Sequence, residues 1–140
     1  MSAFGPTAHG WKEMTDGPMP GGLGAAWSKR VDGAWRYGFL TREDHINPAG
    51  AVHGGILMAF ADHVLGLYVW AAADKAPNVT IQLNTHFLGA VSPGDFLELR
   101  GEVTRATGSM VFVRGLIRVG EKDVVAADGI WRVFRGRGSV

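Results

Sequence analysis

The stretch GGILMAFADHVLGLYVWAAA, residues 54–73, decides the fold that the sequence predicts. It is apolar almost all round, and a helix with this pattern is expected to be buried on most of its faces. Its most apolar part, residues 56–73, has a length at the lower limit for crossing a membrane, but Asp62 and His63 stand in its middle, where an ionisable group is costly in lipid. We therefore expect the core helix of a globular domain and no membrane partner.

The segments around this helix predict β-strands. From Val79 to Phe87 the residues alternate with period two, which places Thr80 on the polar face with Gln82 and Asn84. Short turns join the last four predicted strands, so these strands must pair antiparallel. One such sheet curled around the helix would cover it, which predicts an α+β fold with one long central helix and a curved antiparallel β-sheet. The expected strands cover residues 34–40, 79–87, 96–104, 110–119 and 124–134.

A chain of 140 residues has the length of a single domain. Residues 1–32 are rich in glycine and proline and predict an irregular lead-in, with a short helix at about residues 24–31. Residues 33–135 form the expected domain, and residues 136–140 an expected tail.

Composition excludes several kinds of function. The formal net charge is only +1, which disfavours a nucleic-acid partner. The chain has no cysteine, which excludes a disulfide scaffold, a thiolate nucleophile and a Cys-ligated metal site. The histidines lack metal-ligand spacing, and neither a phosphate loop nor a dinucleotide motif is present, so we expect no metal and no cofactor. The N-terminus does not resemble a secretory signal, and we expect a cytoplasmic protein.

Asp62 is the first candidate catalytic residue. It is the only carboxylate between Asp44 and Asp74, and its neighbours at helical spacing are apolar. Placing a carboxylate there is costly unless it is partnered or has a function, and a desolvated carboxylate can act as a base or nucleophile. A structural Asp that caps a loop or pairs with an arginine is the alternative.

The segment His53-Gly54-Gly55 is the second candidate, because it lies where a loop enters the helix. Backbone N–H groups there have no partner within the helix, and they suit an oxygen that gains negative charge during acyl transfer. Glycines that serve only helix entry or packing are the alternative. Gly54 and Asp62 are separated by about 12 Å along one helix, so one helix cannot supply both groups to one small centre. Two antiparallel helices across a two-fold axis could, which predicts an obligate dimer.

Four further residues are weaker candidates. The Thr80 hydroxyl could position a water, although a threonine on a solvent-facing strand is the alternative. Asn47 precedes a proline and is first a turn former, and second a ligand-binding carboxamide. Phe60 and Trp70 could line an acyl pocket, or could serve core packing.

These residues together resemble a known family. The run NPAGAVHGG at residues 47–55, then Asp62, then Thr80 within NVTIQLN at residues 78–84, is similar to the hotdog-fold acyl-CoA thioesterases. The closest branch is the phenylacetic-acid-degradation type, and the resemblance covers roughly residues 33–135. It implies an α+β hotdog fold, an acyl-CoA substrate, and a homodimer that assembles further into a homotetramer.

The resemblance also implies roles for individual residues. Gly54 matches the position whose backbone N–H polarises the thioester carbonyl, and Asp62 matches the catalytic carboxylate, facing Gly54 of the partner subunit. Asn47 and His53 match residues near the thioester, and Thr80 matches a residue that orients the attacking water. Gly55, Phe60 and Trp70 complete the predicted substrate-binding set.

Three functions are therefore compared. The first is a hydrolase that cleaves acyl- or aryl-CoA thioesters to free acid and CoA. The second is a non-catalytic acyl-CoA-binding protein, which would not need Asp62 or Thr80. The third is a hotdog dehydratase or hydratase, for which a histidine base is needed; His63 adjoins Asp62, but consecutive residues of a helix point to different faces.

Overall fold

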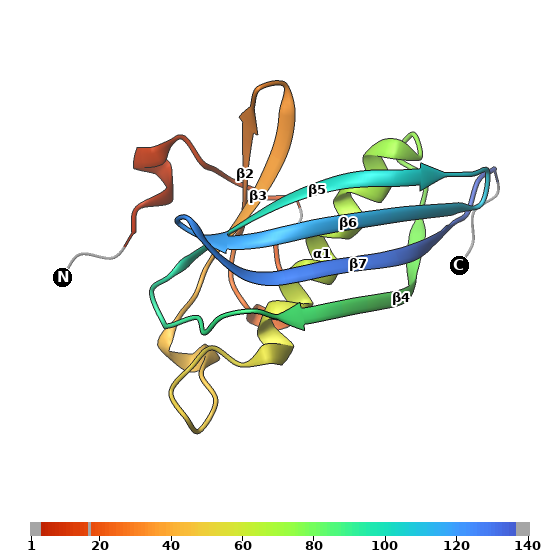
Figure 1. Cartoon of the computed structure of the whole chain (residues 1–140). Helices are drawn as coiled ribbons and strands as arrows, with labels where there is room; N and C mark the ends of the chain where they lie inside the picture. Colours follow the sequence, from red (N-terminus) through yellow and green to blue (C-terminus); the bar gives the residue numbers. More distant parts are fainter. Residues whose placement is uncertain (1–3, 17, 137–140) are drawn as a thin grey trace.

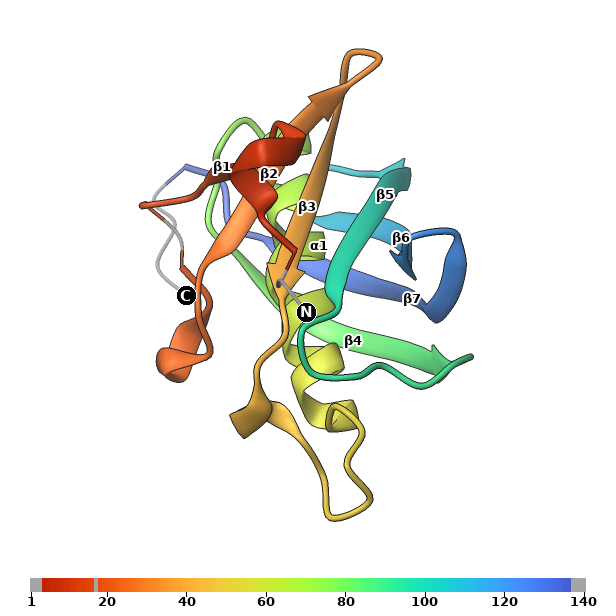
Figure 2. The same cartoon turned by 90° about the vertical axis from the view of Figure 1, so that its left-hand side faces the viewer.

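The structure is a computed structural model that describes residues 4–16 and 18–136, so that all but Gly136 of the expected tail lies outside the described residues. One helix, α1 (Gly54–Ala72), lies against a curved antiparallel sheet (Figures 1 and 2). The described residues form seven strands in the order β1-β2-β3-β5-β6-β7-β4. The predicted α+β class, with one long helix and one antiparallel sheet, is confirmed. The strands are β1 (Lys12–Glu13), β2 (Ala26–Val31), β3 (Ala34–Leu40), β4 (Asn78–Phe87), β5 (Phe96–Ala106), β6 (Met110–Val119) and β7 (Lys122–Val133).

The sheet covers one side of α1. The buried residues of the helix are Leu57, Phe60, Ala61, Val64, Leu65 and Val69. On its other side, Met58 is 37% exposed and Trp70 is 44% exposed. By length and composition alone α1 could cross a membrane, but its buried face belongs to the hydrophobic core. Within a single chain, therefore, only one side of α1 is buried, whereas the sequence predicted burial of most of its faces.

The predicted short helix at residues 24–31 is wrong. Strand β2 occupies most of this segment and pairs antiparallel with β3, from Ala26 opposite Phe39 to Val31 opposite Ala34. The two strands join through Asp32 and Gly33, which have φ angles of 51° and 79°. Asp-Gly is a strong signal for a two-residue β-hairpin, and it could have corrected the prediction.

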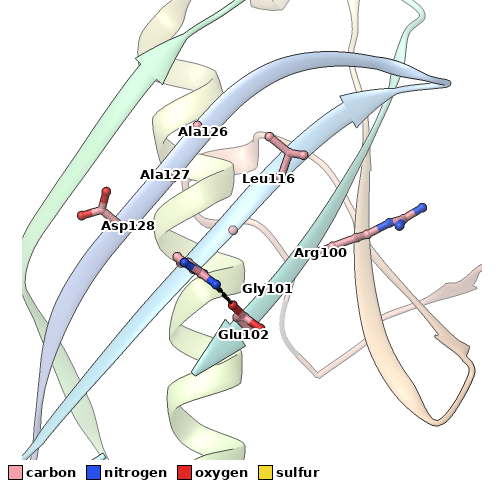
Figure 3. A pocket seen from close by; sticks show the side chains of 9 residues that line it. Arg100, Gly101, Glu102, Leu116, Ala126, Ala127 and Asp128 are labelled. Carbon is pink, nitrogen blue, oxygen red and sulfur yellow. Dashed lines mark hydrogen bonds and ion pairs between the residues drawn. The ribbon is translucent and has the colours of Figure 1, made fainter. Parts of the chain in front are cut away.

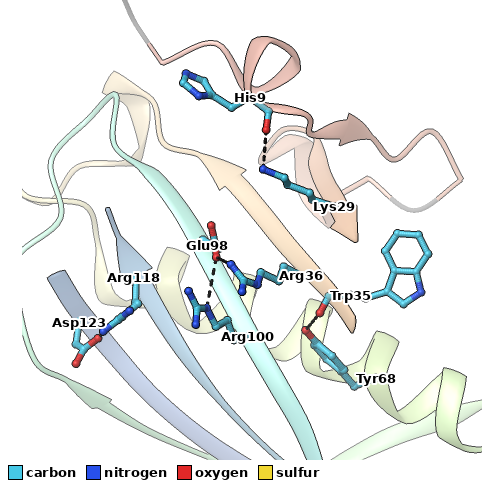
Figure 4. A network of polar contacts seen from close by, with 9 residues as sticks. All are labelled: His9, Lys29, Trp35, Arg36, Tyr68, Glu98, Arg100, Arg118 and Asp123. Carbon is cyan, nitrogen blue, oxygen red and sulfur yellow. Dashed lines mark hydrogen bonds and ion pairs between the residues drawn. The ribbon is translucent and has the colours of Figure 1, made fainter. Parts of the chain in front are cut away.

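The N-terminal segment is packed against the sheet (Figure 2). Strand β1 pairs with β2, and Trp11 is buried against the ring of Phe96, with 4.9 Å between the ring centroids. The Lys29 ammonium donates a hydrogen bond of 2.8 Å to the His9 carbonyl (Figure 4). The lead-in therefore contributes two strands to the sheet, which the glycine and proline content did not indicate.

Candidate active site

A cavity of about 650 Å³ lies between α1 and the start of β4. Three predicted site residues, Asp62, Trp70 and Thr80, lie in its wall. The remaining wall residues are Met14, Asp16, His63, Gly66, Leu67, Asn78, Val79 and Trp131. The cavity therefore combines one carboxylate of the core helix with an apolar and aromatic surface.

Asp62 and Thr80 are in direct contact. The Thr80 hydroxyl donates a hydrogen bond of 2.6 Å to Oδ1 of Asp62. This bond partly compensates the half-buried carboxylate for its lost hydration. The second carboxylate oxygen, Oδ2, accepts no hydrogen bond from the residues that the structure describes, so Asp62 can accept a proton or approach a substrate there.

A β-bulge at Ile81 turns Thr80 toward the helix. Thr80 is opposite Trp131 of β7 and Gln82 is opposite Ile130, so Ile81 is an extra residue in the ladder. Trp131 is buried on the helix side, and residues directly opposite each other in an antiparallel pair share a face. The prediction that Thr80 shares the polar outer face with Gln82 is therefore wrong, because the bulge shifts the alternation by one residue.

The N-terminus of α1 leaves one backbone donor open. The His53 ring accepts a hydrogen bond of 2.9 Å from the Gly55 N–H through Nδ1, and the His53 carbonyl accepts from the N–H groups of Ile56 and Leu57. Among the first four N–H groups of the helix, only that of Gly54 has no partner among the described residues. Because Nδ1 is an acceptor, the proton of a neutral His53 is on Nε2.

Asn47 holds the loop that leads into the helix. Its side-chain oxygen accepts hydrogen bonds of 2.9 Å and 3.2 Å from the N–H groups of Ala49 and Ala51. Its own N–H donates to the Ala51 carbonyl at 2.7 Å. The turn-forming interpretation of Asn47 thus has a direct structural basis.

Within one chain, the predicted site residues fall into separate places. Asp62, Thr80 and Trp70 line the cavity, whereas Asn47, His53, Gly54 and Gly55 lie at the N-terminal end of α1. A Cβ atom on Gly54 would be 3.3 Å from the ring of Phe87, at the far end of β4 from Thr80. Phe60 is fully buried and stacks on Phe39, and it is not part of the cavity wall.

Sequence reasoning missed several wall residues. Met14 and Asp16 come from the N-terminal segment, and no local pattern connects them with α1. His63 also lines the cavity, although its position beside Asp62 predicted a different helix face. Trp131 is visible only once β7 is paired with β4 in the observed register. The alternation in residues 124–134 could have marked it as an inward residue, but not as a neighbour of Thr80.

A second depression, of about 400 Å³, lies over β5, β6 and β7 (Figure 3). Its charged groups have polar partners, since Arg114 forms an ion pair with Glu102, and Asp128 accepts a hydrogen bond of 2.9 Å from Asn84. The acidic groups of the depression are thus engaged by arginine and amide donors. We therefore place the candidate active site at the Asp62 cavity.

Comparison with known proteins gives the family. The family model described as the thioesterase superfamily matches residues 49–126, which include Gly54, Asp62 and Thr80. The chain belongs to the thioesterase superfamily. The fold is that of the hotdog thioesterases, as the resemblance predicted.

Individual thioesterase-superfamily relatives agree with this assignment. A Pseudomonas aeruginosa protein whose name proposes an esterase is 34% identical over 93 residues, which are 65% of this chain and 69% of that protein. A Ralstonia eutropha protein, proposed to be a thioesterase and related to phenylacetic acid degradation, is 29% identical with a TM-score of 0.74, over 85% of this chain and 94% of that one. A hypothetical thioesterase of Streptococcus pneumoniae, crystallised with coenzyme A, is 24% identical with a TM-score of 0.70, over 78% of this chain and 85% of that one.

Proposed function

We propose that this thioesterase-superfamily protein hydrolyses acyl- or aryl-CoA thioesters to free acid and CoA. The observation that carries the proposal is the Thr80–Asp62 hydrogen bond of 2.6 Å in the wall of an open, largely apolar cavity. A protein that only binds acyl-CoA has no need of a half-buried carboxylate there. The S. pneumoniae structure with coenzyme A supports CoA as the thiol part of the substrate.

In the proposed reaction, a water attacks the thioester carbonyl carbon and Asp62 accepts its proton. Thr80 orients the water and Asp62 toward each other. The carbonyl oxygen gains negative charge, and then the C–S bond breaks, so that CoA leaves as a thiolate that takes up a proton. Attack by Asp62 itself, followed by hydrolysis of the anhydride, uses the same atoms, and the geometry is compatible with both routes.

We further propose that the oxyanion donor is Gly54 of the partner subunit in a dimer. Strand β4 ends the sheet, and on this edge Ile81 and Phe87 are each 51% exposed. A long, exposed and apolar edge strand favours pairing with another strand. If two β4 strands pair antiparallel about a two-fold axis, the Thr80 end of one lies beside the Phe87 end of the other. Gly54 packs against Phe87, so its open N–H would approach Asp62 of the other chain.

The roles of the remaining predicted residues follow from the same dimer. The exposed His53 could donate from Nε2 to the thioester, and Trp70 would contact the acyl group. Assembly of two such dimers into a tetramer and a cytoplasmic location stay predictions from the sequence.

The test measures release of free thiol from short-chain, long-chain and aromatic acyl-CoAs. We expect turnover by the wild type and a loss of about 100- to 10,000-fold in Asp62→Asn, the range for removal of a catalytic base. Asp128→Asn is the matched control, because Asp128 also accepts a hydrogen bond from a side chain of β4, but on the outer face of the sheet. Equal rates in Asp62→Asn and wild type would refute the proposal, as would CoA binding without turnover or formation of an unsaturated thioester.

A further inference from the structure

A smaller cavity, of about 210 Å³, adjoins the candidate active site. It extends beneath strands β2 and β3, where Ser28, Trp35 and Tyr37 line it. Three residues, Met14, Leu67 and Trp70, belong to the walls of both cavities. The two cavities therefore share part of their walls, and the wall of the smaller one is largely apolar and aromatic.

Of the three residues that line both cavities, Met14 is the one that does not belong to α1. Its backbone N–H donates a hydrogen bond of 2.9 Å to the Ala26 carbonyl, directly after the paired residues of β1. The segment before it is fixed by buried Trp11 and by the Lys29–His9 hydrogen bond (Figure 4). The backbone of Met14 is thus anchored, while its unbranched side chain can adopt several shapes.

The distances from Asp62 to Leu67 and Trp70 along α1 are comparable to the length of an acyl tail. Leu67 and Trp70 follow Asp62 by five and eight residues on α1, which places them about 7.5 Å and 12 Å along the helix axis. A medium-length tail that runs along α1 from a thioester at Asp62 would reach Leu67 and Trp70, which share the wall between the two cavities with Met14. A longer tail would continue past Met14 into the smaller cavity, which Trp35 and Tyr37 line.

We propose that Met14 sets the acyl-chain length that this site accepts, by closing the passage between the two cavities. The inference rests on the proposed function and adds to it a specificity-determining residue from the N-terminal segment. Met14 lies outside residues 49–126, so the match to the family model does not account for its place in this wall. Removal of the Met14 side chain would join the two spaces and admit longer tails.

The experiment compares kcat/KM for butyryl-, octanoyl-, decanoyl- and palmitoyl-CoA in the wild type and Met14→Ala. Burial of each further methylene favours binding by about fourfold, so two methylenes that enter the second cavity should raise the decanoyl-to-butyryl ratio about fifteenfold. Met14→Leu keeps a side chain of similar size and should keep the wild-type ratio. Lys12→Ala changes an exposed residue of β1 outside both cavities, and it controls for loosening of the N-terminal segment.

Trp35→Ala tests the second cavity directly. It should alter the ratio in the Met14→Ala background but not in the wild-type background, where the passage is closed. An unchanged ratio in Met14→Ala, with turnover that still depends on Asp62, would overturn the inference and leave the proposed function intact.

A binding measurement separates the two failures. If no acyl-CoA is hydrolysed, the proposed function fails. The inference about Met14 is then tested by binding: tryptophan fluorescence measures the affinities of the wild type and Met14→Ala for non-hydrolysable thioether analogues of the same chain lengths. Tighter binding of the decanoyl analogue in Met14→Ala than in the wild type would support it. The same order of affinities in both proteins would refute it.

Discussion

Replacement of Thr80 by valine removes the hydroxyl that contacts Asp62 and preserves the shape of the side chain. A hydrogen bond to a charged group contributes about 1.5–3 kcal/mol. Thr80 is exposed, so solvent lowers this contribution, and we take about 1–2 kcal/mol for the effect on the transition state. At about 1.4 kcal/mol per factor of ten, kcat/KM for thiol release should fall about 5- to 30-fold.

Two comparisons make this prediction specific. Thr80→Ser retains the hydroxyl and should stay close to the wild type. In an Asp62→Asn background, Thr80→Val should cost less than about twofold, because residues that act as a unit are not additive. The reasoning is refuted if Thr80→Val is as active as Thr80→Ser, or if the effects of the valine and asparagine substitutions multiply.

Three further predictions concern stability and assembly. Burial, and secondarily Tyr68, raises the pKa of Tyr37 from 10.0 to about 12, and burial also raises that of Tyr68. The unfolded chain then loses these protons first, so the free energy of unfolding should decline as pH rises from about 10 to about 12, and Tyr37→Phe should lessen this decline in denaturant titrations. Gly38→Ala would overlap the ring of Phe96, and the free energy of unfolding should fall by about 1–3 kcal/mol; an unchanged denaturation midpoint contradicts this. Ile81→Lys places a charge on the exposed edge of β4, and analytical ultracentrifugation should show that it converts the proposed dimer to a monomer. A wild-type protein that is already an active monomer would disprove the dimer.

Much of the fold could be predicted from the sequence because its signals are local. The helix was expected at residues 54–73 and ends at Ala72, and strand β6 occupies residues 110–119 as expected. The hydrophobic effect sets apolar runs and period-two alternation within a single helix or strand, so these patterns can be recognised in the sequence without knowledge of the tertiary structure. The hairpin of β2 and β3 was missed although its Asp32-Gly33 turn is also local.

Asp62 could be selected as a candidate from the sequence because a carboxylate within an apolar helix is anomalous in any globular fold, and the structure places it in the cavity wall. The orientation of Thr80 could not be predicted, because it depends on the single extra residue at Ile81, and a bulge is defined only by the partner strand. The place of Met14 depends in turn on the pairing of β1 with β2, two short strands whose register no periodicity fixes.

The prediction of a dimer also rests on a local property, the separation of two residues on one helix. A helix rises about 1.5 Å per residue, and so the eight residues from Gly54 to Asp62 fix a separation that no packing within one chain can remove. The structure supports Gly54 as the proposed donor: His53 accepts hydrogen bonds from the N–H groups of Gly55, Ile56 and Leu57, and the N–H of Gly54 has no partner among the described residues. In the proposed two-fold pair, the Gly54 N–H near the Phe87 end of one β4 approaches Asp62 near the Thr80 end of the other, so loss of the dimer in Ile81→Lys should abolish turnover in proportion to the monomer formed.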